Sequence, residues 1–438
     1  MENNSRFIAF VIIKDLLNYN KSHNRLLEDN LYTGLGSKDR NLLMHITKGV
    51  FRNKYFLDEN INFYSKNKKI DNVTLSLLYL GSFQILLCDF IPNYAAVNTT
   101  MDIASKKSKK SKTFINAILR KISNNSISFN KRTQSHKLLD CPEWLYDKLI
   151  EDHDKDSVEK YLKIARSKPK IWIRVNTLRT TLQDIVCILK DNNIDFDFSS
   201  PIDNFVSVDK FDKNHIIMDN IKSGLLYIQN PSSGFVIKYL NPQPYEEILD
   251  TCSAPGGKVS YIAQETNNKA KITCIDNDKK RMKILEHNIK TLHIDNIDLV
   301  NSDSSKILLN KQYDKILLDP PCSSSGTFQK NPDVKWKLNE KLVSLFRETQ
   351  LNILCNISKY LKVNGQLLYS TCSLFKDENE YNIIEFLKIN RNFSIMKAHD
   401  SLLCNFKNKF GGITIMPDSN NYEGMFAIKL IKNEENNS

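Results

Sequence analysis

The sequence predicts a multidomain protein: an all-α domain (1–130), a small α+β linker module (131–235) and an α/β domain with a mostly parallel sheet (236–438). Three observations predict this order. The chain has 438 residues, enough for two or three domains of ordinary size. Glycine is absent between Gly81 and Gly224, whereas nine of the 13 glycines lie from Gly224 onward. In the last domain, short apolar runs alternate with helical patterns, which is typical of an α/β fold.

The composition excludes several classes of protein. A hydrophobic content of 41% argues against intrinsic disorder. No run of about 18 uncharged apolar residues occurs, and the first residues lack the features of a secretory signal. The nine cysteines include no C-x-x-C pair, so we expect neither a zinc ribbon nor another metal site. The sequence therefore indicates a reduced, soluble, cytoplasmic protein without membrane association.

The first domain is expected to be helical because its apolar residues recur every three or four positions. This spacing occurs over residues 7–17, 42–50, 73–88 and 114–122. We expect the helical domain to end near Asn125.

Positive charge is concentrated between residues 101 and 140. Lys and Arg number 62 in the chain against 50 Asp and Glu, a net charge of +12. This segment holds ten basic residues against only Asp102 and Asp140, so eight of the twelve net charges lie here. A phosphate-binding surface or an ordinary solvated face explains the run equally well, and an AT-rich genome also favours lysine. The ten are Lys106, Lys107, Lys109, Lys110, Lys112, Arg120, Lys121, Lys131, Arg132 and Lys137.

The second and third domains are predicted from strand and helix patterns. IWIRVN indicates a strand from which Arg174 projects, and residues 182–189 indicate a helix, as in a small α+β module. The runs EEILD, KITCID, NIDLVNSD, YDKILLD and GQLLYST then alternate with helices, which indicates a parallel sheet covered on both faces. Ligands of such sheets bind beyond the carboxyl ends of the strands.

The first turn of interest follows the strand EEIL. It reads Asp250, Thr251, Cys252, Ser253, Ala254, Pro255, Gly256, Gly257 and Lys258. The two glycines allow a backbone to approach a ligand closely, at the start of a helix. A phosphate-binding Walker A loop is rejected, because Cys252 stands where glycine is required and Val259 follows Lys258. A tight turn without a nucleotide is the alternative.

Carboxylates end the next two strands. Asp276 is suited to accept hydrogen bonds from the two hydroxyls of a ribose. Asp278 competes for that role, although it can instead cap the following helix. Asp303 could accept from an adenine amino group, but aspartate is common where strands end.

Two cysteines lie at the ends of what should be neighbouring strands. Cys322 follows Asp319 and two prolines, which force the chain out of the sheet, and Cys372 ends the strand GQLLYST. An aromatic residue in place of Cys322 would favour methylation of an amino group. Free cysteines are usually buried apolar residues, as we expect for Cys88, Cys187, Cys274 and Cys355. Cys322 and Cys372 are candidates for nucleophilic chemistry, with a redox pair as the alternative.

Three strings carry a family resemblance: DTCSAPGGK, DPPCSSSGTFQKNPDVKW and YSTCSLFKDENE resemble motifs of RNA cytosine-C5 methyltransferases. SKDRNLLMHITKGVFRN, LYLGSFQILLCDFIPNYAAVN and FINAILRKI resemble the NusB-like RNA-binding domain. The strings RVNTLR and IQNPSSG, which lie between these two groups of motifs, also fit the resemblance. The chain is thus similar to RsmB-type (Sun/Fmu) 16S rRNA methyltransferases over nearly its whole length. The departures are Ser253, Asn230 and the pair Ser324 and Ser325; Asn230 puts a linker contact in doubt.

The resemblance implies a Rossmann-like domain that uses S-adenosyl-L-methionine. The methyl donor would lie along Cys252–Lys258, with Asp276 on the ribose, Asp303 on the adenine and Asp319 near the donor. Asp319 would also lie near the N3 and N4 edge of the reacting base. Cys372 would add to C6 of cytosine and Cys322 would help to release the product. Lys258 would contact substrate or fix the site.

The implied partner is 16S rRNA, free or in an early small-subunit particle, and the implied target is the cytosine usually numbered 967. Arg174, Lys106, Lys107, Lys109 and Lys110 would hold the RNA backbone of a monomeric enzyme. Alternatives are methylation of another RNA cytosine, methylation of an amino group, and a non-catalytic NusB-like rRNA-binding assembly factor.

Overall fold

A computed structural model describes residues 4–18, 23, 34–127, 134–198, 201–208, 215–398, 401–418 and 420–434. The chain forms two compact units. Met1–Lys168 with Phe328–Leu338 makes the first, and Pro169–Thr327 with Asn339–Ser438 makes the second. Lys131 and Arg132 of the basic segment lie outside the described residues. Within the described ranges, no helix is long and apolar enough to cross a membrane.

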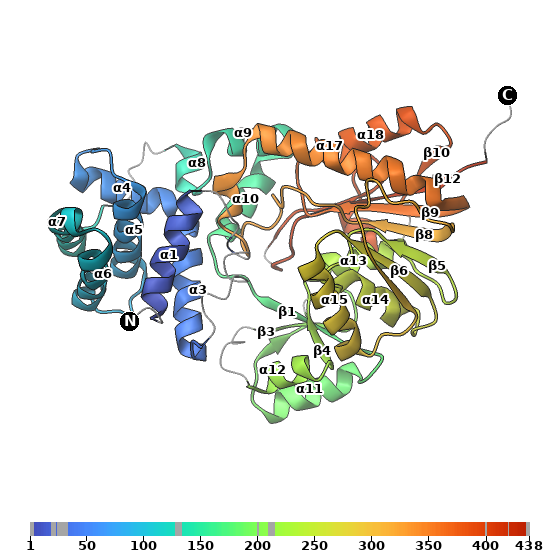
Figure 1. Cartoon of the computed structure of the whole chain (residues 1–438), viewed down its shortest axis with the longest axis horizontal. Helices are drawn as coiled ribbons and strands as arrows, with labels where there is room; N and C mark the ends of the chain where they lie inside the picture. Colours follow the sequence, from blue (N-terminus) through green and yellow to red (C-terminus); the bar gives the residue numbers. More distant parts are fainter. Residues whose placement is uncertain are drawn as a thin grey trace. The chain divides into compact units, whose positions relative to one another are not determined.

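The first unit is helical, as predicted (Figure 1). Four of its helices include or closely match the four predicted ranges, and α7 (Lys112–Asn124) ends beside the predicted end of the helical domain, although the unit continues to Lys168. The N-terminal set is α1 (Ser5–Leu17), α3 (Ser37–Arg52), α4 (Lys54–Ser65), α5 (Asn72–Leu87), α6 (Asn93–Lys107), the 3-10 turn η1 (Lys109–Ser111) and α7 (Lys112–Asn124).

Helix α5 is enclosed by the other N-terminal helices. Every residue from Ser76 to Gln84 is buried, and α5 contacts α1, α3, α4, α6 and α7. A helix that has apolar or small residues on every face can bury its surface only when other elements surround it. Helix α7 instead buries a single stripe, and its members have the i, i+3, i+4, i+7 spacing: Ile115, Ile118, Leu119 and Ile122.

The first unit also contains elements that the sequence assigned to later domains. The helices α8 (Ser135–Leu138), α9 (Glu143–Asp152) and α10 (Lys155–Ala165) belong to it, and so does the segment 328–338 with the helix α16 (Val334–Lys337). Trp336 packs against the helical core, and its Nε1 donates to the Phe51 carbonyl oxygen at 2.7 Å. These contacts explain why a segment far along the chain belongs to the first unit.

The second unit begins with a small antiparallel sheet. The strands β1 (Ile171–Val175), β2 (Phe196–Asp197), β3 (Phe205–Val208) and β4 (Leu226–Ile228) have the order β2-β3-β1-β4, with α11 (Leu182–Asp191) and α12 (His215–Lys222). The buried face includes Ile173, Val175 and the α11 residue Ile185. Because α11 buries this stripe, its Cys187 is exposed, and the expectation that Cys187 is a core residue is wrong.

The larger sheet has the strand order β10-β12-β9-β8-β5-β6-β7, and β11 pairs with β12. The five strands from β9 to β7 are parallel, while β12 runs antiparallel to β9. The chain order reverses between β5 and β8, which is where ligands bind in this class of sheet. The strands are β5 (Glu247–Asp250), β6 (Lys271–Asp276), β7 (Ile297–Asn301), β8 (Tyr313–Leu318), β9 (Leu361–Thr371), β10 (Phe393–Met396), β11 (Ile413–Ile415) and β12 (Met425–Lys432).

Helices cover both faces of this sheet (Figure 1). Ile248 and Leu317 point to one face, where they share a core with α13 (Pro231–Leu240), α14 (Gly257–Glu265) and α15 (Lys279–Leu292). Their neighbours Leu249 and Leu318 point to the other face, packed with α17 (Glu340–Ile357) and α18 (Glu380–Ile389). The two-residue alternation of strands explains this division and leaves the strand ends open for chemistry.

Candidate active site

The turn after β5 has a conformation that depends on glycine. Gly256 has a φ of +102°, in the left-handed region that side chains with a Cβ rarely adopt. The Ser253 hydroxyl donates to the Asp250 carbonyl oxygen at 2.7 Å, and the bond between Ala254 and Pro255 is cis. Burial raises the pKa of the Cys252 thiol well above its usual value, so this cysteine is a poor nucleophile.

Asp276 and Asp278 have different roles, which the sequence left open. Asp278 caps α15 by accepting from the Lys280 and Arg281 amides at 2.8 and 3.2 Å. Asp276 lies at the strand end, where its two carboxylate oxygens accept from the Asp278 amide at 3.0 Å and the Ala254 amide at 3.2 Å. Asp276 therefore connects the end of β6 directly to the glycine turn.

Asp303 lies in the turn after β7 with an exposed side chain. The Ser305 hydroxyl and amide donate to its carboxylate at 2.7 and 2.9 Å, and these hydrogen bonds lower the pKa of Asp303. The adjacent Ser304 hydroxyl donates to the Thr251 carbonyl oxygen. The turn after β7 is therefore hydrogen-bonded to the turn after β5, at the same edge of the sheet.

Lys258 and Asp319 form an ion pair across the point where the strand order reverses. Lys258 begins α14 after β5, and Asp319 follows the adjacent strand β8. Burial alone would lower the pKa of Lys258, but Asp319 and the Cys372 sulfur together raise it. Lys258 is therefore a fixed positive charge and not a base. The Ser370 hydroxyl donates to the second Asp319 oxygen at 3.3 Å.

The two predicted cysteines meet at the same place. The Cys322 and Cys372 sulfur atoms are 3.1 Å apart, and both cysteines are free thiols. The Ser324 hydroxyl lies 3.5 Å from the Cys372 sulfur. The hydrogen bond with Cys372, followed by burial, raises the pKa of Cys322 well above its usual value. Cys322 is accordingly a thiol that can donate to the Cys372 sulfur.

Arg174 does not have the place that the sequence suggested. It is 1% exposed, and its guanidinium donates to the Gly257 carbonyl oxygen at 3.0 Å, the Ser260 hydroxyl at 2.6 Å and the Gln229 side chain. Its guanidinium carbon lies 4.8 Å from the ring centroid of Tyr261. The expectation that Arg174 holds an RNA backbone is wrong, because α14 covers it. Arg174 instead fixes the start of the helix that carries Lys258.

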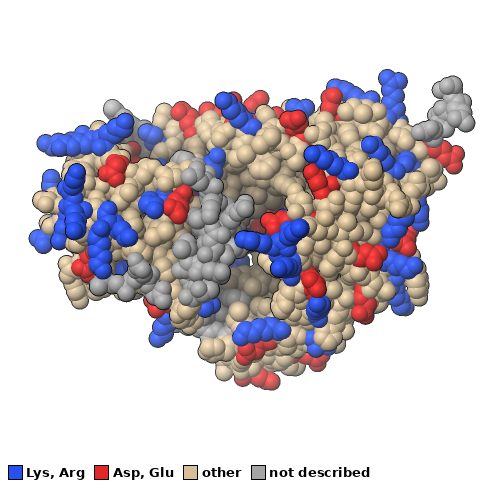
Figure 2. All heavy atoms as spheres, in the orientation of Figure 1, with Lys and Arg blue, Asp and Glu red and all other residues tan. Residues whose placement is uncertain are grey.

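The four predicted lysines of the basic segment are all exposed. Lys106 and Lys107 end α6, and Lys109 and Lys110 lie in η1. Figure 2 shows basic side chains gathered over the end of the first unit where α6 and α7 lie. This charge is available to a polyanion.

Sequence reasoning missed the hydroxyl groups of the site. Ser370 and Ser324 lie within the predicted motifs, yet nothing in their spacing distinguishes them from structural serines. Their roles depend on which side chain each faces, and only the three-dimensional arrangement supplies that information.

A Rossmann-like domain with a glycine turn and acidic residues at successive strand ends defines a methyltransferase that uses S-adenosyl-L-methionine. The donor set fits this cofactor, since carboxylates after β6 and β7 can accept from its hydroxyl and amino groups. Residues 237–431 match the model of the family described as "16S rRNA methyltransferase RsmB/F". Residues 3–124 match the NusB family, and 141–211 match the RsmF/B-like ferredoxin-like domain. These matches bear out the resemblance to the RsmB/F family along most of the chain, and the predicted fold class is confirmed.

Relatives and solved structures agree with this assignment. A "probable ribosomal RNA small subunit methyltransferase B" of Bacillus subtilis is 28% identical, covering 95% of this chain and 96% of the relative. The Photorhabdus laumondii "ribosomal RNA small subunit methyltransferase B" is also 28% identical, covering 98% and 99%. The crystal structure of PH0851 has the same fold, with a TM-score of 0.81 at 24% identity over 99% of this chain and 100% of that chain. A methyltransferase homologue from Pyrococcus horikoshii is 28% identical with a TM-score of 0.54, covering 66% and 99%.

Proposed function

We propose that this protein methylates carbon C5 of a cytosine in 16S rRNA in the cytoplasm, with position 967 as the expected target. The observation that carries the proposal is the pair of sulfur atoms 3.1 Å apart, Cys322 and Cys372, beside the ion pair of Lys258 and Asp319. The names of the curated relatives support ribosomal RNA of the small subunit as the substrate.

The chemical difficulty is that C5 of cytosine belongs to an aromatic ring and is a weak nucleophile. The Cys372 thiolate would form a bond to C6, and the electron pair of the C5–C6 double bond would move toward C5 and the N3 edge. The Lys258 ammonium group lies close enough to interact with the Cys372 sulfur and so places a positive charge beside the reacting atoms. Asp319 would hydrogen-bond the N3 and N4 edge of the ring and stabilise the electron-rich adduct.

The cysteine pair suggests how the last proton is removed. In the free enzyme, hydrogen bonding to Cys372 keeps Cys322 in its thiol form. Once the Cys372 sulfur is bonded to C6 it carries no negative charge, so the main cause of the high Cys322 pKa disappears. Cys322, which is partly exposed, would then release its proton to water and, as a thiolate, accept the proton from C5. The electrons of the C5–H bond would restore the ring double bond, and the bond between C6 and Cys372 would break.

The cofactor would be held by residues at the ends of β5 to β8. We assign Cys252–Lys258 to its backbone contacts, Asp276 to the ribose, Asp303 to the adenine, and Asp319 to the donor end beside the base. When bound, S-adenosyl-L-methionine supplies an electrophilic methyl group. The target cytosine must leave its stack to reach this edge of the sheet, so a single-stranded or loop nucleotide is favoured.

Analysis of the product nucleosides tests the proposal. Purified protein, 16S rRNA and S-adenosyl-L-methionine should yield 5-methylcytosine, which bisulfite sequencing would locate. N4-methylcytosine would instead indicate an amino-methyltransferase that uses the Asp-Pro-Pro turn. No methylation of either free rRNA or an early small-subunit particle would favour the non-catalytic assembly factor.

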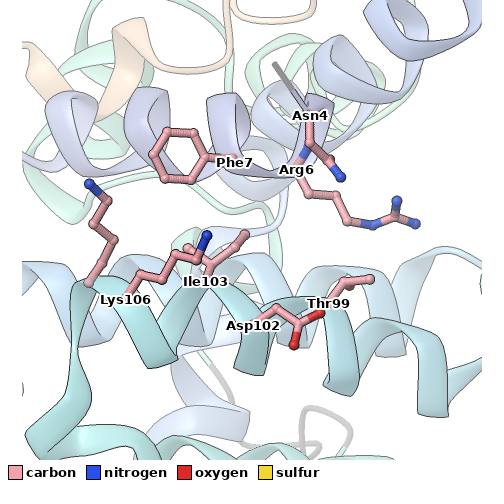
Figure 3. A pocket seen from close by; sticks show the side chains of 8 residues that line it. Asn4, Arg6, Phe7, Thr99, Asp102, Ile103 and Lys106 are labelled. Carbon is pink, nitrogen blue, oxygen red and sulfur yellow. The ribbon is translucent and has the colours of Figure 1, made fainter. Parts of the chain in front are cut away.

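A groove between α1 and α6 is where we place contact with the RNA (Figure 3). The groove has a volume of about 140 Å³. Phe7 of α1 lies opposite Lys106 of α6, and Arg6 extends over Thr99 at the other end of the groove. The Lys107 ammonium is 5.3 Å from the centroid of the Phe7 ring. Arg6 Nε donates at 2.7 Å to the side chain of Gln84, which is fully buried, so the guanidinium is held in place. An aromatic ring flanked by cations suits a stacked base and its phosphates.

Charge-matched variants test this groove. Lys106→Glu/Lys107→Glu and Lys109→Glu/Lys110→Glu make the same change in net charge, but the second pair does not line the groove. Fluorescence anisotropy with a short single-stranded RNA should show about tenfold weaker binding for the first pair. An equal loss for both pairs would mean that the groove has no particular role.

A further inference from the structure

A buried carboxylate lies directly behind the two cysteines. Glu378 is fully buried, although the motif KDENE that contains it has no part in the chemistry described above. A charged side chain is buried only when hydrogen bonds compensate for the loss of water. The contacts of Glu378 therefore indicate what this residue is for.

Glu378 binds the residue that follows each cysteine. One carboxylate oxygen, Oε2, accepts from the amide of Ser323, which follows Cys322, at 2.9 Å. The other, Oε1, accepts from the hydroxyl of Ser373, which follows Cys372, at 2.6 Å. The two serine hydroxyls are themselves 3.0 Å apart. The two turns thus share one buried acceptor, although 50 residues separate them in sequence.

Gln350 of α17 and Tyr369 of β9 hold Glu378 in this orientation. The Gln350 amide donates to Glu378 Oε2 at 2.8 Å and to the Pro321 carbonyl oxygen at 2.9 Å. The Tyr369 hydroxyl donates to the Glu378 carbonyl oxygen at 2.6 Å. Gln350 and Tyr369 are fully buried. The carboxylate has little freedom to move, and neither have the turns that it binds.

From these contacts we infer that Glu378 is the positioning residue of the cysteine pair, which fixes the distance between the two sulfur atoms by holding both turns. The inference rests on the proposed function. Its geometric basis is that one carboxylate joins both turns. Its negative charge near Cys322 also contributes to the high pKa of that thiol. Glu378 itself touches neither sulfur in the described contacts, so it acts through the turns.

Two variants separate the charge from the shape of Glu378. Glu378→Gln keeps the shape but loses the charge, and Glu378→Ala loses both. Glu385→Gln is the control, because Glu385 lies seven residues further along in α18, is partly exposed and forms an ion pair with Lys388 at the surface. In the free protein, alkylation of each cysteine is followed by mass spectrometry across a pH series. This readout requires no methylation, so it remains informative if the proposed function fails.

We expect Glu378→Gln to shift the alkylation profile of Cys322 to lower pH by about one unit. It should also lower kcat by about tenfold or more with an unchanged KM for RNA. The glutamine side chain has a single acceptor oxygen and can hold only one of the two turns in the same way, and misplaced reacting groups cost rate and not binding. Glu378→Ala should lower kcat by about a hundredfold, and if it unfolds, Glu378→Gln carries the test. The inference is overturned if Glu378→Gln matches Glu385→Gln in both the alkylation profile and kcat, which would leave Glu378 a structural residue only.

Discussion

Replacing Arg174 by methionine should damage the cofactor-binding turn and leave RNA binding intact. The buried guanidinium joins β1 to the first turn of α14, through the Gly257 carbonyl oxygen and the Ser260 hydroxyl. Methionine fills a similar volume without hydrogen bonds. The start of α14 would then lose its fixed position relative to Gly256 and Lys258, and S-adenosyl-L-methionine should bind more weakly.

The size of the effect follows from two opposing contributions. Three hydrogen bonds from a charged donor are worth about 1.5–3 kcal/mol each, or roughly 4.5–9 kcal/mol in all. Burial lowers the pKa of Arg174 from its usual value to about 10, which corresponds to a cost of roughly 3 kcal/mol for the charged form. Subtracting the cost of burial from the contribution of the hydrogen bonds gives an expected loss of about 1.5–6 kcal/mol in the free energy of unfolding.

Denaturant unfolding and calorimetric titration with S-adenosyl-L-methionine measure both effects. Arg179→Met is the matched control, because Arg179 is exposed and donates to the Ser223 carbonyl oxygen. The control should lose less than about 1 kcal/mol. The reasoning is refuted if Arg174→Met is as stable as the control, or if it weakens RNA binding while cofactor affinity is unchanged.

Two other predictions concern single side chains. Burial lowers the pKa of Lys335 to about 8, so the unfolded chain binds this proton more tightly between pH 8 and 10.5. The free energy of unfolding should therefore rise with pH across that window in the wild type and less in Lys335→Met; parallel curves in thermal unfolding would contradict this. Asp303→Ala should weaken cofactor binding about tenfold, whereas Asp278→Ala should cost about 1 kcal/mol as a lost helix cap and spare affinity. If the two aspartates were misassigned, calorimetry would show that Asp278→Ala weakens cofactor binding more than Asp303→Ala does.

The spacing of apolar residues, together with the residues at the turns, predicted the helices and strands that have an apolar face with a regular repeat. The stripe of α7 and the strands β5 to β9 follow directly from residue spacing. The cysteine pair was predictable as well, because parallel strands bring their carboxyl ends to one edge. The choice between Asp276 and Asp278 required the structure, since a capping residue and a strand-end residue differ only in which backbone amides they face.

The remaining features depend on contacts between distant parts of the chain. Strand alternation placed Arg174 on the face opposite Ile173, but only the packing of α14 determines that this face is covered. Trp336 resembles a residue of the catalytic motif in sequence, yet it packs in the first unit against Phe51. Glu378 stands within the string YSTCSLFKDENE, where nothing in the sequence distinguishes it from its acidic neighbours; its burial is accompanied by a hydrogen bond from Gln350 of α17.

The central claim is that Cys372 is the nucleophile and Cys322 releases the product. Each cysteine is replaced by alanine, and the variant is incubated with rRNA and S-adenosyl-L-methionine and then separated under denaturing conditions. Cys322→Ala should accumulate a covalent protein–RNA adduct, because the C5 proton is not removed and Cys372 cannot leave. Cys372→Ala should form no adduct and no 5-methylcytosine. Methylation by Cys372→Ala, or an adduct formed by it, would contradict the assignment.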